Sequence, residues 1–170
     1  MDNHILFSES QKFKQWWVWV ILGSINFLFI FGIYKQVMNG EQFGNKPMSD
    51  TGLVITAVTT MVLTIAIINF RLDTIIKQDG IYVRFFPIHL KFKHYKWDRL
   101  SKLFVRQYSP IKEYGGWGVR LSLFGHGTAY NITGDKGLQL IFLDKKKLLI
   151  GTDKPDELTE TLNKIGQIKL

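Results

Sequence analysis

The segment from Tyr114 to Arg120 combines aromatic, glycine and basic residues that suit contact with an anion or with a protein. Three glycines around Trp117 allow positive φ angles or close backbone approach, and the planar guanidinium of Arg120 can bind a carboxylate or phosphate. Glycine-rich phosphate loops lead into a helix, whereas this stretch is predicted to join two strands. We therefore interpret Tyr114, Trp117 and Arg120 as an interaction loop, with Trp117 either plugging the core or contacting a protein.

A second candidate site consists of basic residues on three successive predicted strands. If these strands form a meander, outward-pointing side chains on them share one face. That face would suit anionic lipid or an acidic partner, with an ordinary solvated sheet surface as the alternative. The residues are Arg84, Lys91, Lys93, Lys102 and Arg106.

Other chemistry has little support in the sequence. The chain has no cysteine, which excludes thiolate catalysis, disulfides and Cys-ligated zinc. His89 and His94 point to opposite faces of one predicted strand and His126 lies in a predicted turn, so we expect no metal site. No nucleophile elbow or nucleic-acid motif accompanies the basic residues. We expect a protein that is not an enzyme and has no cofactor, nucleic-acid partner or small-molecule substrate.

Two apolar runs must position these residues relative to a membrane. Residues 16–34 and 52–70 are each 19 residues long, contain no charged side chain and would span about 28 Å as helices. We predict a tail over residues 1–15, transmembrane helices over 16–34 and 52–70, a short periplasmic loop over 35–51, and a cytoplasmic domain over 71–170.

The orientation follows from basic residues near the spans. Lys35 and Lys46 lie between the spans, whereas five Lys and Arg residues lie close outside them, namely Lys12, Lys14, Arg71, Lys77 and Arg84. Cytoplasmic flanks carry the excess of such residues. We therefore expect a multi-pass membrane protein with both termini in the cytoplasm; the family resemblance described below implies the bacterial inner membrane.

Polar residues within the spans predict a helix contact. Asn26 lies near the middle of the first span, where an unpaired amide is costly. Thr56, Thr60 and Thr64 recur at every fourth residue of the second span and so form one stripe. We expect this stripe to pack against Asn26 within the hairpin, with contact to another membrane protein as the alternative.

After residue 71 the pattern becomes that of an antiparallel β-unit, with short segments rich in β-branched and aromatic residues between turn signals such as Asp79-Gly80. A helix opened by Pro155 and stopped by Gly166 follows, with an apolar stripe that would close the sheet. The predicted strands are Leu72–Lys77, Gly80–Phe86, His89–Tyr95, Ser101–Tyr108, Val119–Phe124, Ala129–Thr133, Leu138–Leu143 and Lys147–Gly151.

Four stretches carry a family resemblance, residues 74–87, 95–100, 114–120 and 149–155. They resemble bacterial membrane proteins, largely uncharacterised, in which a pleckstrin-homology-like (PH-like) domain follows two N-terminal transmembrane helices. The resemblance implies a membrane-anchored α+β fold, with a transmembrane hairpin followed by an antiparallel PH-like β-barrel or sandwich and a C-terminal helix. It implies no catalytic residue.

These observations favour a non-enzymatic membrane binding or scaffolding protein, an accessory subunit of a larger inner-membrane complex. The expected partners are the bilayer, with its anionic lipids, and other membrane-protein subunits. One alternative is a stand-alone module that binds anionic lipid. Another is a small membrane enzyme that uses the loop from Tyr114 to Arg120.

Overall fold

The computed structural model describes residues 4–122 and 125–169. The chain divides into two compact units. We call Lys14–Asn69 the helical hairpin, and we call Met1–Phe13 together with Phe70–Leu170 the β-domain. The hairpin is therefore an insertion between the first strand of the β-domain and the rest of it.

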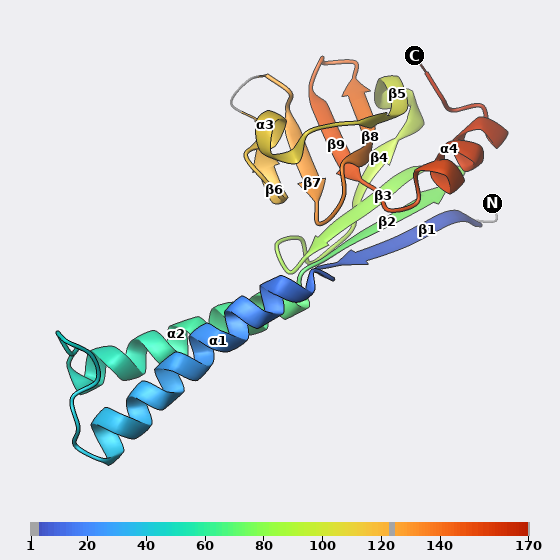
Figure 1. Ribbon diagram of the computed structural model, residues 1–170. Helices are drawn as coiled ribbons and strands as arrows, with labels where there is room; N and C mark the ends of the chain where they lie inside the picture. The colour runs from blue at the N-terminus through green and yellow to red at the C-terminus, as the bar shows by residue number, and fades with distance from the viewer. Residues whose placement is uncertain (1–3, 123–124, 170) are drawn as a thin grey trace. The chain divides into compact units, whose positions relative to one another are not determined.

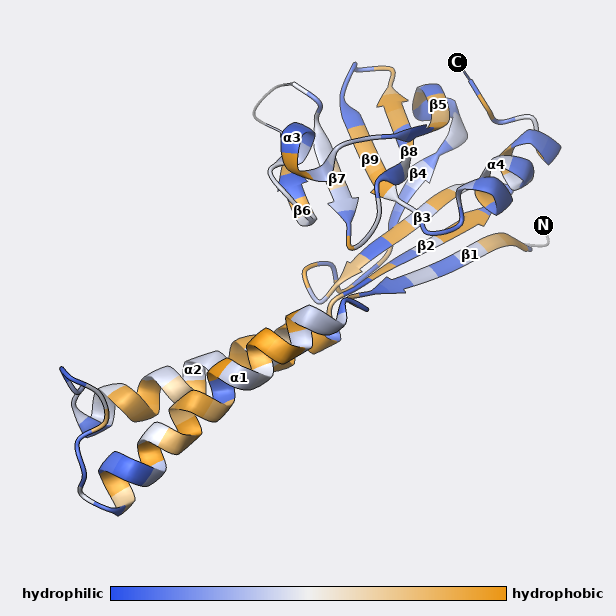
Figure 2. Ribbon diagram, viewed as in Figure 1, coloured by the Kyte–Doolittle hydropathy of each residue, from blue (hydrophilic) through white to orange (hydrophobic). Residues whose placement is uncertain are grey.

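The helical hairpin contains two long apolar helices. Helix α1 (Trp16–Ile33) continues through a π-helical turn at Tyr34–Met38, and α2 covers Asp50–Asn69. Hydrophobic residues make up most of both helices (Figure 2). Both helices are long and apolar enough to cross a membrane, and each exceeds the predicted span by a few residues at its loop end.

The two helices contact each other through the predicted polar pair. Asn26 Nδ2 donates to the hydroxyl of Thr64 at 2.8 Å and to the carbonyl of Leu22 at 2.7 Å. Thr56 and Thr60 donate instead to carbonyls of their own helix, which is the usual way a helical threonine satisfies its hydroxyl. The hydroxyl stripe therefore serves packing within the hairpin, as expected, through Thr64.

The first sheet of the β-domain has four antiparallel strands in the order β1-β2-β3-β4 (Figure 1). The strands are β1 (Ile5–Lys12), β2 (Arg71–Lys77), β3 (Gly80–Phe86) and β4 (Lys93–Lys96).

Strand β1 lies where the sequence predicts only an N-terminal tail. Lys12 pairs with Arg71, so the strand that leads into α1 lies beside the strand that follows α2. Side chains alternate along β1, and those of Phe7, Glu9 and Gln11 are buried. Because two of these buried residues are polar, the segment lacks the apolar alternation by which a half-buried strand is usually found.

The second sheet has five strands in the order β5-β8-β9-β7-β6, antiparallel except for the parallel pair β7 and β9. Short helices α3 (Pro110–Tyr114) and η2 (Trp97–Arg99) connect strands, and α4 (Pro155–Lys164) follows the last one. The strands are β5 (Leu100–Gln107), β6 (Gly118–Leu121), β7 (Thr128–Asn131), β8 (Lys136–Phe142) and β9 (Lys147–Gly151).

One apolar core lies between the two sheets and under α4. It combines residues from both sheets, such as Phe85 and Leu140, with Leu158 and Leu162 of α4, while Ile165 packs at its edge. The predicted stripe of the C-terminal helix is thus confirmed, and Gly166 follows the helix at φ 64°, where glycine is favoured.

The structure corrects the sequence-based picture at three places. The two sheets are not closed into a barrel by strand pairing among the described residues. Only residues 93–95 of the predicted strand over residues 89–95 pair with β3, as part of β4, and residues 87–92 form a loop. The segment between β5 and β6 contains α3, so the glycine-rich stretch follows a short helix. The predicted strand over residues 119–124 ends beyond the described part of the chain.

Candidate functional site

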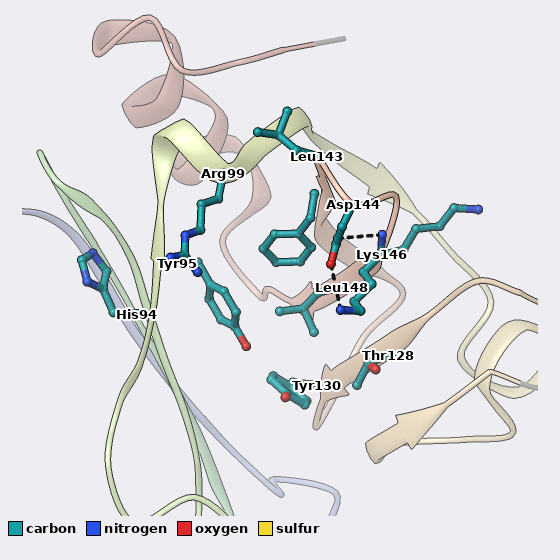
Figure 3. Close-up of a pocket in the computed structure, with 11 residues that line it drawn as sticks. His94, Tyr95, Arg99, Thr128, Tyr130, Leu143, Asp144, Lys146 and Leu148 are labelled. Carbon is teal, nitrogen blue, oxygen red and sulfur yellow. Dashed lines mark hydrogen bonds and ion pairs between the residues drawn. The ribbon is translucent and has the colours of Figure 1, made fainter.

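A cavity of about 530 Å³ opens between the two sheets of the β-domain (Figure 3). Strand β4 provides one wall, and the opposite wall comes from β7, β9 and the turn between β8 and β9. The aromatic and aliphatic lining consists of Tyr95, Tyr130, Phe142 and Leu148. A site of this size and lining is typical of small-ligand or side-chain binding pockets.

Arg99 gives the cavity a free positive charge. It belongs to η2 and lines the cavity beside Tyr95 (Figure 3). Its side chain is exposed and forms no hydrogen bond or ion pair within residues 4–122 and 125–169. An unpaired guanidinium next to apolar walls can bind a carboxylate or phosphate through its planar fork.

Several other polar groups in or near the cavity already have a partner within the protein. The amine of Lys146 lies 2.8 Å from the carboxylate of Asp144, and that of Lys147 donates to the carbonyl of Gly125. Lys93 reaches the hydroxyl of Tyr130 at 3.0 Å. Burial, followed by the charge and hydroxyl of the neighbouring Tyr130, raises the pKa of Tyr95, so this phenol is protonated at neutral pH. Among the described residues that line it, the cavity therefore offers hydroxyl donors and one cation, Arg99, without a partner.

The predicted basic face does not exist as one surface. Arg84 lies on the first sheet and is bound to Asp73, with its Nη2 2.7 Å from the carboxylate. Lys93 pairs with Val83, so its side chain lies on the core side of the sheet, opposite to that of Arg84. Lys102 and Arg106 lie on the second sheet. Of these five residues, only Lys91 and Lys102 are exposed without a partner in the described part of the chain. The single basic face is absent because the chain forms two sheets instead of one meander.

Arg106 belongs to a structural cluster on the outer face of the second sheet. It forms a two-point ion pair with Glu113 of α3, at 2.7 and 3.2 Å, and a bond to Gln139. The hydrogen bond from Arg106, followed by that from the Ser109 backbone N–H, holds the pKa of Glu113 below its ordinary value. His126 lies 3.7 Å from the same carboxylate. This cluster fixes α3 on the sheet.

The interaction loop divides into one buried and two exposed residues. Tyr114 is 4% exposed and packs with Tyr108, Ala129 and Leu149 in a second small core. Trp117 is 38% exposed and its indole N–H donates to the carbonyl of Gly134, so the expectation that it plugs the core is wrong. Arg120 donates to the carbonyl of Trp117. The protein-contact alternative for Trp117 stays open.

Exposed apolar residues continue this loop along an edge strand. Strand β6 is the last strand of the second sheet, so one side of it has no strand partner among the described residues. Ile111 and Leu121 are 65% and 72% exposed and line one open hollow beside β6. We call Ile111, Trp117 and Leu121 the β6 edge patch.

Comparisons with protein families, with characterised proteins and with solved structures find no match to this chain.

The sequence did not indicate the inter-sheet cavity. Its lining comes from residues between His94 and Leu148, brought together only by the packing of two sheets. Tyr95 and Phe142 read as ordinary core residues of their strands, and Arg99 as one more residue of a basic segment. A signal existed in Trp97-Asp98-Arg99, which interrupts the strand pattern between β4 and β5.

Proposed function

We propose that this chain is a two-span membrane protein whose β-domain is a non-enzymatic binding module, acting as an accessory subunit of a larger inner-membrane complex. The length and apolar surface of α1 and α2 support the membrane-spanning part. A binding role also agrees with the resemblance of the β-domain to PH-like domains, which are binding folds.

The pairing of β1 with β2 supports the proposed topology. Lys12 and Arg71 are neighbours in one sheet, so the chain must enter and leave the membrane on the same side. Two spans satisfy this requirement, and the excess of basic residues outside the hairpin favours the cytoplasmic side for both termini.

The chain itself allows a direct test of this topology, because it has no cysteine. Single cysteines are introduced at Gly44 in the hairpin loop and at Lys112 in α3, and intact cells are treated with a membrane-impermeant thiol reagent. We expect labelling of Gly44→Cys alone, with Lys112→Cys reacting only after lysis. Equal labelling of both in intact cells contradicts the topology.

The β6 edge patch carries the subunit proposal. Exposed aromatic and aliphatic side chains on an edge strand are the features that protein partners use, through a packed anchor and through added strand pairing. Ile111 and Leu121 line one hollow beside β6, and Trp117 directly precedes this strand. Tryptophan is also among the residue types that contribute most to the binding energy of protein interfaces.

The test compares purified complexes of three full-length chains in mild detergent. The double variant Trp117→Ala with Leu121→Ser should lose a stoichiometric partner that copurifies with the unaltered chain. Leu143→Ser, at a site that is 68% exposed on another turn, should retain it. Unchanged copurification by the folded double variant overturns the subunit proposal.

A second candidate function rests on Arg99. The unpaired guanidinium beside the aromatic cavity could bind an acidic side chain or the headgroup of an anionic lipid. Binding of a lipid headgroup would support the alternative function, a stand-alone lipid-binding module. Arg99→Gln should then reduce binding of the reconstituted chain to soluble short-chain phosphatidylglycerol, measured by calorimetry. Unchanged binding, or no binding by the unaltered chain, rejects it.

A further inference from the structure

The loop between β3 and β4 exposes apolar side chains at a defined end of the first sheet. Ile88 and Leu90 are 55% and 73% exposed. Phe92 is 36% exposed, and its ring centre lies 4.5 Å from the guanidinium carbon of Arg84. Apolar side chains of this size are unfavourable when exposed to water. Three of them within five residues form a concentrated apolar patch.

The loop is held in this form by its middle residue. The backbone N–H of His89 donates to the carbonyl of Phe85 at 2.7 Å, and the imidazole Nδ1 of His89 accepts from the N–H of Phe85 at 3.3 Å. Its ring also meets the edge of Tyr130, with centroids 5.0 Å apart. Because His89 is directed inward, its neighbours Ile88 and Leu90 are directed to solvent.

Strand register gives the location of this loop. Phe86, the last residue of β3, pairs with Arg71, the first residue of β2, and Arg71 pairs with Lys12, the last residue of β1. The loop therefore begins at the end of the sheet from which the chain continues into α1 and returns from α2 (Figure 1). Only Phe13 to Gln15 separate β1 from α1, and only Phe70 separates α2 from β2.

The surroundings of the apolar side chains are basic. Lys91 lies between Leu90 and Phe92 and has no partner in the described part of the chain, and Lys12 is exposed at the same end of the sheet. Arg71 packs over Phe86, 5.2 Å from the ring centre, and shares the carboxylate of Asp73 with Arg84. Apolar side chains flanked by basic residues match the interface of an anionic bilayer, with acyl chains below and phosphates around them.

We infer that the β3–β4 loop inserts Ile88 and Leu90 into the bilayer interface, with Lys91 and Lys12 among the lipid phosphates. The inference rests on the proposed function, because it takes α1 and α2 as membrane-spanning. It adds a third membrane contact that restrains the β-domain against the bilayer, beyond the two covalent connections.

Single-cysteine fluorescence tests this contact in the full chain. Four variants, Ile88→Cys, Leu90→Cys, Phe27→Cys and Leu143→Cys, are labelled with an environment-sensitive nitrobenzoxadiazole dye and reconstituted in vesicles of phosphatidylcholine and phosphatidylglycerol. Quenching is then measured with two lipids, one that carries a nitroxide on the upper acyl chain, for positions 88, 90 and 143, and one that carries it near the end of the acyl chain, for position 27. Leu143 is the matched control, because it is exposed nearly as much as Leu90 and its N–H is bonded to Arg99, beyond the other end of β4.

The expected result is a blue-shifted emission and several-fold stronger quenching at positions 88 and 90 than at 143, together with strong quenching at 27 in the middle of α1. Strong quenching at 27 with positions 88 and 90 equal to 143 overturns the inference and leaves the membrane anchor intact. Absence of quenching at 27 overturns the anchor and the inference together. Two loop positions guard against a label that disturbs one of them.

Discussion

Glu9 is a buried carboxylate that connects the beginning of the chain to its last helix. Its side chain accepts hydrogen bonds from the hydroxyl of Thr152 and the backbone N–H of Asp153, both at 2.7 Å. Gln11, two residues along β1, donates to the carbonyl of Gly151 at the same distance. These polar contacts explain why β1 has polar residues on its buried side.

Replacing Glu9 by alanine should destabilise the β-domain strongly. The variant leaves the buried hydroxyl of Thr152 and the part-buried N–H of Asp153 without their acceptor, and we expect the free energy of unfolding to fall by roughly 2–3 kcal/mol. Urea unfolding in mild detergent, followed by tryptophan fluorescence, measures the change. Ser8→Ala, at an exposed position of the same strand, should leave the unfolding curve almost unchanged; equal effects would argue against the role of Glu9.

Glu113 predicts a pH dependence of stability. The hydrogen bond from Arg106 lowers the pKa of Glu113 in the folded protein. The charged carboxylate therefore stabilises the fold fully above the ordinary pKa of 4.5, and this stabilisation is lost as the pH falls from 4.5 through the lowered pKa of the folded protein. Glu113→Gln should therefore lower the melting temperature at pH 7, by the equivalent of roughly 1–2 kcal/mol, and the difference from the unaltered chain should narrow toward pH 3.

Thermal unfolding between pH 3 and pH 7 measures this difference. Asp98→Asn, at an exposed carboxylate of η2, is the control and should follow the unaltered chain at every pH. A deficit of Glu113→Gln that stays constant with pH would contradict the assigned role of the ion pair.

At the scale of elements, strands bounded by tight turns could be predicted from the sequence. A strand whose pairing partner lies far away in the sequence could not. The bounds of β3 and β9 agree with prediction because tight turns fix them, as at Asp79-Gly80. Strand β1 was missed because its partner lies some 60 residues later and its buried face is polar. The alternating apolar residues Ile88, Leu90 and Phe92 imitated a strand, but their side chains are exposed to solvent.

The candidate site was less predictable than the strands. Arg84 and Arg106 looked like free surface charges, yet each has a carboxylate partner, Asp73 and Glu113, that sequence spacing did not reveal. The cavity beside Arg99 depends on the packing of two sheets, which pairwise strand patterns do not specify. By contrast, the contact of Asn26 with the threonine stripe was predictable, because helical spacing and the cost of an unpaired amide both act locally.

The contact between the two long helices gives a prediction of its own. Thr64→Val removes the acceptor of the Asn26 amide, whereas Thr59→Val on the same helix removes only a bond to the carbonyl of Ile55. We expect Thr64→Val to weaken the hairpin by about 1 kcal/mol more than the control. Titration with sodium dodecyl sulfate, followed by helical circular dichroism, compares the two; identical curves would contradict a stabilising pair.

At the scale of the molecule, the β-domain is discontinuous in sequence and should fold without its insertion. Phe13 and Phe70 lie next to the last pair of β1 and β2, Lys12 with Arg71, and their ring centres are 6.5 Å apart, so an Asn-Gly turn can join them in place of Lys14–Asn69. We expect this shortened chain to be a soluble, folded monomer. A chain that begins at Arg71 lacks β1 and the acceptor of Thr152, and should aggregate.

Size-exclusion chromatography and circular dichroism of the two shortened chains check this prediction. Equal behaviour, either both folded or both aggregated, would show that β1 does not complete the domain.

The position of β1 in the sequence also determines the order in which the parts of the protein can fold during synthesis. The ribosome makes this strand before the hairpin, and its neighbour β2 emerges only after the entire hairpin has been synthesised. If α1 and α2 span the membrane as proposed, β1 therefore stays unpaired while they are inserted. A hairpin left with a single crossing would put β1 and β2 in different compartments and prevent the sheet from forming. A misinserted chain would therefore display an unfinished domain, the kind of exposed apolar surface that quality-control proteases recognise.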